Sequence, residues 1–486
     1  MKNSLKNILA IIILTAIFIV NYVPYHGQMP QHVDSWIVIS NADFVLDEQE
    51  LKFIEPFSYT YSSYPPGSHL SLAVITSITG LNMLFLAQLL PGIFFVMLGM
   101  LLYLVSKELF KNDIASLCVM AFTFLSLSNI TMLGPFYLVP FIWGMLLSLL
   151  FFYFILKNKW KTAFLIFIAI ALTHRTSMVF ALLALGLYLV LNRENWKKLK
   201  YLLIIAITSL IIFFASGGAK LFYSMMQNLF VFEKSEPYIS FRMSLGLIII
   251  FLIGLGFYLI LTREKKASSF LIPLFSLMAL NAFIYWNWQG FFIVYRRLFP
   301  LTFMFSSFFV GYAVYSISIF INKILPKKIR KYNLALIILL IIFVPMAVNA
   351  NIESRKNNNI HVTNDENILF SKFGEIYPGE YLATDHLEAF SLPYYNLKPV
   401  QLSPAHGTTQ GYFNQLSPCY MNRIPECFAG FLYKYNFTYV YTGTKINTSY
   451  FKPVLKYNGK EIYEIQKEEF KEHMKKEFNV TINTAD

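Results

Sequence analysis

Long apolar runs recur through the first 350 residues of this chain, and most approach the length of a membrane-spanning helix. A helix needs about 20 apolar residues to cross a hydrocarbon core about 30 Å thick. Hydrophobic residues make up 56% of the 486 residues, and the mean hydropathy is +0.52. The runs therefore predict a polytopic α-helical membrane protein.

We predict about 11 crossings from the length of the runs. Their expected bounds are 7–24, 83–105, 112–130, 136–156, 162–173, 176–192, 201–215, 244–262, 268–286, 298–321 and 333–350. Loops predicted to be inside carry 19 Lys and Arg, against 7 in the loops predicted outside before residue 351. Basic loops favour the cytoplasm. We therefore expect a multi-pass protein of the cell membrane, with a cytoplasmic N-terminus and residues 351–486 outside.

The formal net charge of +13 does not indicate a nucleic-acid partner. The basic residues lie between apolar runs, where they orient membrane spans rather than form a patch for phosphate backbones. The membrane itself is the expected environment.

The first external loop, residues 25–82, is the first long polar interruption of the apolar pattern. We expect a short helix at Ser35–Leu46 lying at the membrane surface, with Trp36 at the interface. A second helix is expected at Gly67–Gly80, which is too short to cross and should be interfacial or partly inserted.

Beyond the membrane domain (1–350), residues 351–365 have a linker-like composition, and residues 366–467 predict a small extracytoplasmic α/β domain. Strands are expected at Glu380–Thr384 and Phe437–Thr442, helices at His386–Tyr395 and Phe428–Tyr435, and a hairpin at Val454–Ile465 that turns at Asn458-Gly459. Residues 468–486 form a charged tail.

Cys419 and Cys427 flank a short polar loop in this domain. Outside the cytoplasm they could form a disulfide, and two free thiols remain equally open. No Cys/His spacing indicates a zinc site.

Asp34 has two interpretations. Asp is among the best residues to open a helix, so it could be an N-cap. A carboxylate at the outer face beneath an apolar lid could instead act as a general base. Composition alone does not decide between them.

The residues around Asp34 carry a resemblance to a known family. An apolar span, Asp34 within His-x-Asp-Ser-Trp, and then Tyr64-Pro65-Pro66-Gly67 before a hydrophobic half-helix resemble the start of GT-C membrane glycosyltransferases. That superfamily includes protein O-mannosyltransferases, aminoarabinose transferases and oligosaccharyltransferases, and no single subfamily matches closely. The resemblance covers the organisation of residues 1–350 and the local motif over 34–70. It implies that Asp34 is the catalytic loop acid, with Asp47 and Glu48 as a second acidic pair.

Basic residues that could bind a donor phosphate occur in two places. Arg296 and Arg297 fall at the outer start of a span, where positive charge is disfavoured without an anionic partner. His174 and Arg175 lie in a turn between two short spans, below the outer surface, where ionisable groups usually mark a site. Guanidinium groups match phosphate oxygens in a bidentate fork. Interfacial anchoring and a structural pair are the alternatives for these residues.

Other candidates for substrate binding are Tyr64, His69 and Glu236. Glu236 resembles a glutamate in an external loop of oligosaccharyltransferases, although a solvated loop residue is the simpler account. The turn at Thr131–Pro135 lacks the carboxylate that those enzymes use for metal, so a divalent metal is possible but not expected to be required.

The resemblance implies an integral-membrane transferase that moves a sugar from a polyprenyl-phosphate donor to a glycan, lipid or protein acceptor on the extracytoplasmic side. Asp34 would deprotonate the acceptor hydroxyl, with inversion at the anomeric carbon. The alternatives are a transporter, flippase or binding protein for lipid-linked saccharides without transferase activity, and a transferase-like scaffold whose external domain binds a partner.

Overall fold

The computed structural model describes residues 3–27, 29–30, 33–49, 66–127, 137–191, 193–215, 241–287, 295–326, 333–354, 362–384, 389, 391–401, 424–443 and 445–478. Packing divides the chain into two compact units. The helical unit comprises Met1–His26, Pro65–Ser68 and Ala87–Asn359, and the mixed unit comprises Gly27–Tyr64, His69–Leu86 and Ile360–Asp486. The predicted domain boundaries follow the chain, whereas these units follow packing, so the first external loop groups with the C-terminal residues.

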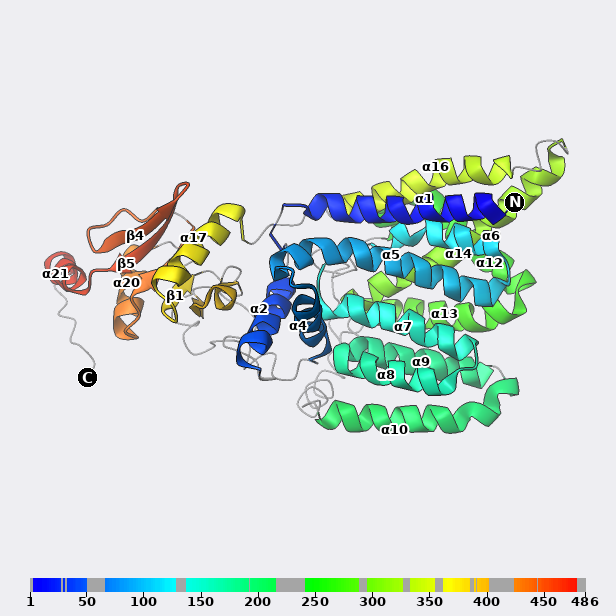
Figure 1. Ribbon diagram of the computed structural model, residues 1–486, viewed down its shortest axis with the longest axis horizontal. Coiled ribbons are helices and arrows are strands. Elements are labelled where there is room, and N and C mark those ends of the chain that lie inside the picture. The colour runs from blue at the N-terminus through cyan, green and yellow to red at the C-terminus, as the bar shows by residue number, and fades with distance from the viewer. Residues whose placement is uncertain are drawn as a thin grey trace. The chain divides into compact units, whose positions relative to one another are not determined.

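The helical unit is a bundle of helices that lie side by side (Figure 1). Its elements are α1 (Asn3–Tyr22), η1 (Val23–Tyr25), α5 (Met83–Phe110), α6 (Asp113–Ala121), η2 (Thr123–Leu125), α7 (Pro140–Leu156), α8 (Trp160–Thr173), α9 (Arg175–Leu191), η3 (Arg193–Lys198), α10 (Leu199–Ala215), α12 (Phe241–Arg263), α13 (Lys265–Asn287), α14 (Tyr295–Ile324) and α16 (Leu334–Glu353). Among the described residues, α1, α5, α12, α14 and α16 contain apolar stretches long enough to cross a membrane. Shorter apolar helices are α7, α8 and α9. The protein is therefore a multi-pass helical membrane protein, and each predicted span has a helix in its place.

Charged side chains join helix ends that the sequence assigns to the cytoplasm. Lys6 of α1 and Lys107 of α5 both pair with Asp113 at the start of α6, at 3.1 and 3.0 Å. Lys157, which follows α7, contacts Glu108 of α5 at 2.6 Å. These ends gather at one end of the bundle, as the predicted alternation requires. Which side of the membrane this end faces remains a prediction.

The predicted span 112–130 is not one regular helix. α6 ends at Ala121 and gives way to the 3₁₀ turn η2. The Ser307 hydroxyl donates to the Phe122 carbonyl at 2.8 Å, and the Asn351 side-chain amide donates to the Phe124 carbonyl at 2.8 Å. Buried carbonyls that leave a helix need such donors in a membrane. Polar side chains of α14 and α16 therefore stabilise the break.

The mixed unit contains the helices of the first loop and a small sheet. Its elements are α2 (Val33–Glu48), α4 (Gly67–Thr79, from His69 onward), α17 (Asn364–Ile376), β1 (Tyr381–Thr384), η4 (Leu392–Tyr395), β2 (Lys398–Gln401), α20 (Pro425–Lys434), β3 (Tyr439–Val440), β4 (Phe451–Tyr457), β5 (Lys460–Ile465) and α21 (Lys467–Phe478). The strand order is β2-β1-β3-β5-β4, parallel among β2, β1 and β3 and antiparallel from β3 to β4. The predicted hairpin is confirmed, since Asn458 and Gly459 connect β4 to β5 with φ of 43° and 79°.

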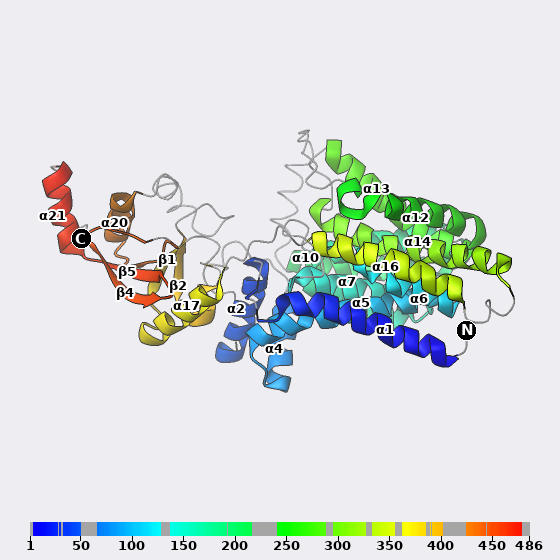
Figure 2. The same ribbon diagram turned by 90° about the horizontal axis from the view of Figure 1, so that it is seen from above.

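Helices cover both faces of this sheet (Figure 2). On one face, Phe373 of α17 packs edge-on against Tyr439 at 5.1 Å between ring centroids. On the other, Phe470 of α21 is fully buried in a cluster with Ala429 and Tyr450. The segment expected to be a charged tail therefore begins as a docked helix, because one aromatic residue anchors an otherwise charged sequence. Cys427 of α20 is disulfide-bonded, whereas Cys118 is free and buried.

Helix α17 spans the predicted boundary between linker and domain. Its N-terminus is a capping box in which Thr363 and Glu366 bond each other's backbone N–H groups. The Glu366 carboxylate also accepts from the Tyr441 hydroxyl and from Lys460 Nζ at 2.9 Å. Burial alone would raise the pKa of Glu366, but these hydrogen bonds outweigh burial and lower the pKa. Glu366 therefore ties α17 to the sheet in its charged form.

We expect Glu366→Gln to lower the free energy of local opening of β3 and β5 by about 2–4 kcal/mol at pH 7, because Lys460 loses a buried partner. Since the folded pKa is lowered, the stabilisation is present above the unfolded value, about 4.3, and is lost as the pH falls through the folded value. Hydrogen exchange of β3 and β5 amides in the full chain measures both effects.

The matched control is Glu468→Gln. Glu468 pairs with Lys471 within α21 and is 82% exposed, so its loss should leave exchange unchanged. Equal protection in wild type and Glu366→Gln across this pH range would contradict the role assigned to Glu366.

Candidate functional site

Helix α2 begins at Val33, so Asp34 lies inside its first turn rather than at the N-cap position. A carboxylate there is stabilised by the positive end of the helix dipole. Asp34 is half-buried. The structure therefore places the predicted acid on a helix, with a partly accessible carboxylate.

Trp36 does not lie on a one-sided surface helix. Residues 35–42 of α2 are all buried, and Trp36 is fully buried against Tyr394 and Tyr395 of η4, at 6.2 Å between ring centroids in each case. An interfacial helix would bury one face only. The α2 helix is instead a packed element of the mixed unit, which corrects the predicted environment of Trp36.

In the helical unit, His174 forms the turn between α8 and α9. Its Nδ1 accepts the Ser177 backbone N–H at 3.1 Å and contacts Ser177 Oγ at 2.9 Å. This is the position of an N-cap group for α9. Because Nδ1 accepts, a neutral ring carries its proton on Nε2. Arg175 opens α9 and, like His174, is half-buried.

Gly67 of the Tyr-Pro-Pro-Gly motif lies against this turn. A Cβ at Gly67 would come within 2.5 Å of Thr173 Oγ1 and 2.8 Å of the Leu172 carbonyl. The motif therefore allows the start of α4 to approach the backbone just before His174. Gly67 and the His174 turn, which are about 107 residues apart in the sequence, are therefore neighbours in the helical unit.

We expect Gly67→Ala to destabilise the helical unit by about 1–3 kcal/mol, because the methyl group would overpack backbone that cannot move aside. Thermal unfolding in detergent measures the loss. Gly186→Ala in α9 is the control, since its Cβ would meet no described atom within 4 Å and should be neutral or slightly stabilising. Equal unfolding temperatures for the two variants would refute this packing.

Substitutions of His174 distinguish its capping of α9 from a role in binding polyprenyl phosphate. His174→Ala should cost about 1 kcal/mol of stability, whereas His174→Asn should restore it by capping α9 through its side-chain oxygen. Only the asparagine variant lacks the Nε2 proton while keeping the fold. If binding of polyprenyl phosphate to His174→Asn matched wild type, the imidazole would serve as a cap alone.

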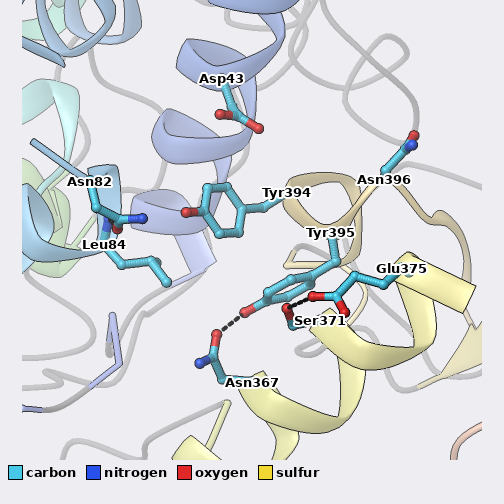
Figure 3. Close-up of a pocket in the computed structure, with 10 residues that line it drawn as sticks. Asp43, Asn82, Leu84, Asn367, Ser371, Glu375, Tyr394, Tyr395 and Asn396 are labelled. Carbon is cyan, nitrogen blue, oxygen red and sulfur yellow. Dashed lines mark hydrogen bonds between the residues drawn. The ribbon is translucent and has the colours of Figure 1, made fainter. Parts of the chain in front are cut away.

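The mixed unit contains a polar pocket of about 450 Å³ that the sequence patterns did not predict (Figure 3). Its walls come from α2, η4 and α17, and from the residues that open α5. The lining residues are Asp43, Asn82, Leu84, Asn367, Ser371, Gly374, Glu375, Tyr394, Tyr395 and Asn396. The signal in the sequence was the polar group Ser40-Asn41 and Asp43 in the middle of α2, between two apolar stretches.

Asp43 is one of the two acids that line this pocket. Burial, and then the charge of Asp47 one helical turn away, raises its pKa to about 6. Nearby, Asn82 caps α5 by accepting the Leu84 N–H at 2.8 Å. The Asn82 amide and the Tyr394 hydroxyl both line the pocket (Figure 3).

The structure describes only some of the remaining predicted residues. Asp47 and Glu48 are exposed at the end of α2, and His69 is buried, which lowers its pKa to about 4. Tyr64 and Glu236 lie outside the described residues. Arg296 and Arg297 belong to the first turn of α14, but their side chains lie outside the description. Convergence of Asp34, His174-Arg175 and Arg296-Arg297 remains a prediction. Within the described residues, no group of three His, Cys, Asp or Glu could hold a metal.

No family model matches the sequence, and no curated protein gives a significant match. Solved structures do match. ArnT from Cupriavidus metallidurans in the apo state is 10% identical, with 94% of this chain and 98% of that chain covered and a TM-score of 0.59. The same protein bound to undecaprenyl phosphate gives a TM-score of 0.60, at 10% identity over 93% and 97% of the chains.

Two further transferases share the architecture. The Archaeoglobus fulgidus oligosaccharyltransferase is 12% identical, with 89% of this chain and 67% of that chain covered and a TM-score of 0.54. The mycobacterial arabinofuranosyltransferase AftD is 12% identical, with 96% and 40% covered and a TM-score of 0.55. The chain therefore has the fold of the GT-C membrane glycosyltransferases.

Proposed function

We propose that the protein is a membrane glycosyltransferase that moves a sugar from a polyprenyl-phosphate donor to an acceptor on the extracytoplasmic side. The observation that carries the proposal is the similarity over 94% of this chain to ArnT, which has also been solved with undecaprenyl phosphate bound. The similarity includes the C-terminal residues, so the whole organisation is shared rather than a bundle of helices alone.

In the proposed reaction, Asp34 accepts the proton of the acceptor hydroxyl. The acceptor oxygen attacks the anomeric carbon, and the bond from that carbon to the phosphate oxygen breaks. Polyprenyl phosphate leaves with the electron pair, and the anomeric centre inverts. A positioned base contributes about 10²–10⁴-fold to such a step.

Positive groups would hold the departing phosphate. His174 and Arg175 meet at the N-terminus of α9, where backbone N–H groups and the helix dipole favour an anion. Arg296 and Arg297 are the second candidate pair. The proposed chemistry requires no divalent metal, because guanidinium groups can neutralise the charge that develops on phosphate.

Replacing Asp34 tests the mechanism. Asp34→Asn keeps the size and helical position of the side chain but removes the base, so kcat should fall by about 10²-fold or more. Proteoliposomes containing the protein, polyprenyl-phosphate-linked radiolabelled hexoses and a lipid and glycan extract as acceptor provide the assay.

Asp47→Asn, one of the exposed acids at the end of α2, is the comparison variant for charge at this loop. Transfer at the wild-type rate by Asp34→Asn would refute the mechanism. Binding of polyprenyl phosphate with no transfer by the wild type in any acceptor mixture would instead favour a transporter or flippase.

A further inference from the structure

The pocket around Asp43 is built by packing rather than left by loose loops. Trp36 supports Tyr394 and Tyr395 from the side of α2. The Tyr395 hydroxyl donates to Asn367 Oδ1 of α17 at 2.5 Å. Gly374 allows α17 to approach η4, because a Cβ there would meet the Tyr395 carbonyl at 2.0 Å. Three elements are thus held at a fixed separation around the cavity.

The polar groups of the pocket match the hydroxyls of a sugar. A sugar hydroxyl both donates and accepts, and the lining offers both kinds of partner. Asp43 and Glu375 accept, and the amides of Asn82 and Asn396 can do both. The Tyr394 hydroxyl also lines the pocket, and a phenol hydroxyl can both donate and accept. Figure 3 shows Asp43 and Asn82 near Tyr394.

The charge of the pocket restricts the kind of sugar. Two carboxylates line it, and none of its described lining residues is Lys, Arg or His. A phosphate or a uronic acid would therefore meet like charge without a cation to balance it, which is costly in a partly buried site. A neutral sugar is compatible with these walls, and an amino sugar would gain an ion pair.

The position of Asp43 separates this pocket from the reacting acid. Asp34 and Asp43 are nine residues apart on one helix, which corresponds to about 13 Å along its axis and to opposite faces. One sugar ring cannot contact both carboxylates. A ligand in the pocket is therefore not the hydroxyl that Asp34 would deprotonate.

We propose that this pocket is a secondary saccharide-binding subsite that anchors a neutral or amino sugar of the acceptor glycan at a distance from the reacting hydroxyl. The role as an acceptor subsite rests on the proposed transferase function, whereas saccharide binding itself does not. The acceptor class is thereby narrowed to a glycan or glycolipid with a non-anionic sugar beyond the point of attachment.

Saturation-transfer NMR on the full chain in nanodiscs tests binding directly. The probes are the methyl glycosides of glucose, galactose and mannose, the corresponding 2-amino sugars, and the methyl glycosides of glucuronic and galacturonic acid. At least one neutral or amino sugar should bind, and each uronate should bind about fivefold or more weakly, because its carboxylate meets two carboxylates without a cation.

Two conservative variants connect binding to this pocket. Tyr394→Phe keeps the ring contact with Trp36 but removes the hydroxyl, and should weaken all bound probes about fivefold. Asp43→Asn should reduce any preference for amino over neutral sugars, since Glu375 remains as the second carboxylate. Glu468→Gln on α21 is the control and should behave as wild type. Binding of no neutral or amino sugar, equal binding of uronates, or unchanged binding by Tyr394→Phe would each overturn the subsite.

Kinetics separate this proposal from the proposed function. In the transfer assay, Asp43→Asn should raise the KM for acceptor and leave kcat near wild type, the opposite of Asp34→Asn. Loss of kcat in Asp43→Asn with unchanged sugar binding would overturn the anchoring role. Sugar binding without any transfer would leave the subsite standing and reject the transferase.

Discussion

The helical unit depends on the requirement that backbone polar groups inside a membrane find partners within the protein. After α6 ends at Ala121, the buried carbonyls of Phe122 and Phe124 accept hydrogen bonds from Ser307 and Asn351. Where α8 turns into α9, His174 accepts the backbone N–H that the helix start leaves unpaired. At each of these two irregularities a polar side chain bonds the backbone, and the second one adjoins residues suited to an anion.

In the mixed unit, a polar cavity lies beside well-packed aromatic rings. Trp36 fixes η4 against α2, and α17 is fixed to the sheet by the buried Glu366 carboxylate. Asp34 and Asp43, on opposite faces of α2, therefore lie in different environments. Asp34 lies in the first turn, where the helix dipole favours its charge, and Asp43 lies in the pocket, where burial opposes it.

Sequence patterns predicted the features that depend on local residues. Apolar length located the helices of the bundle, and Asn458-Gly459 located the hairpin turn. The break after α6 was not predictable, because its donors, Ser307 and Asn351, lie about 185 and 227 residues away. The packing of α21 through Phe470 was not predicted, because charged residues dominate its sequence and give no apolar pattern. The pocket joins α2 to η4, and no periodicity within either segment indicates that pairing.

The pairing of α2 with η4 has a consequence for biogenesis. The ribosome adds Trp36 about 360 residues before Tyr394, which at about 5–20 residues per second is an interval of about 20–70 s. Throughout that time Trp36 has no aromatic partner from η4. Until η4 has been made, the buried stretch 35–42 of α2 must therefore be covered by other contacts.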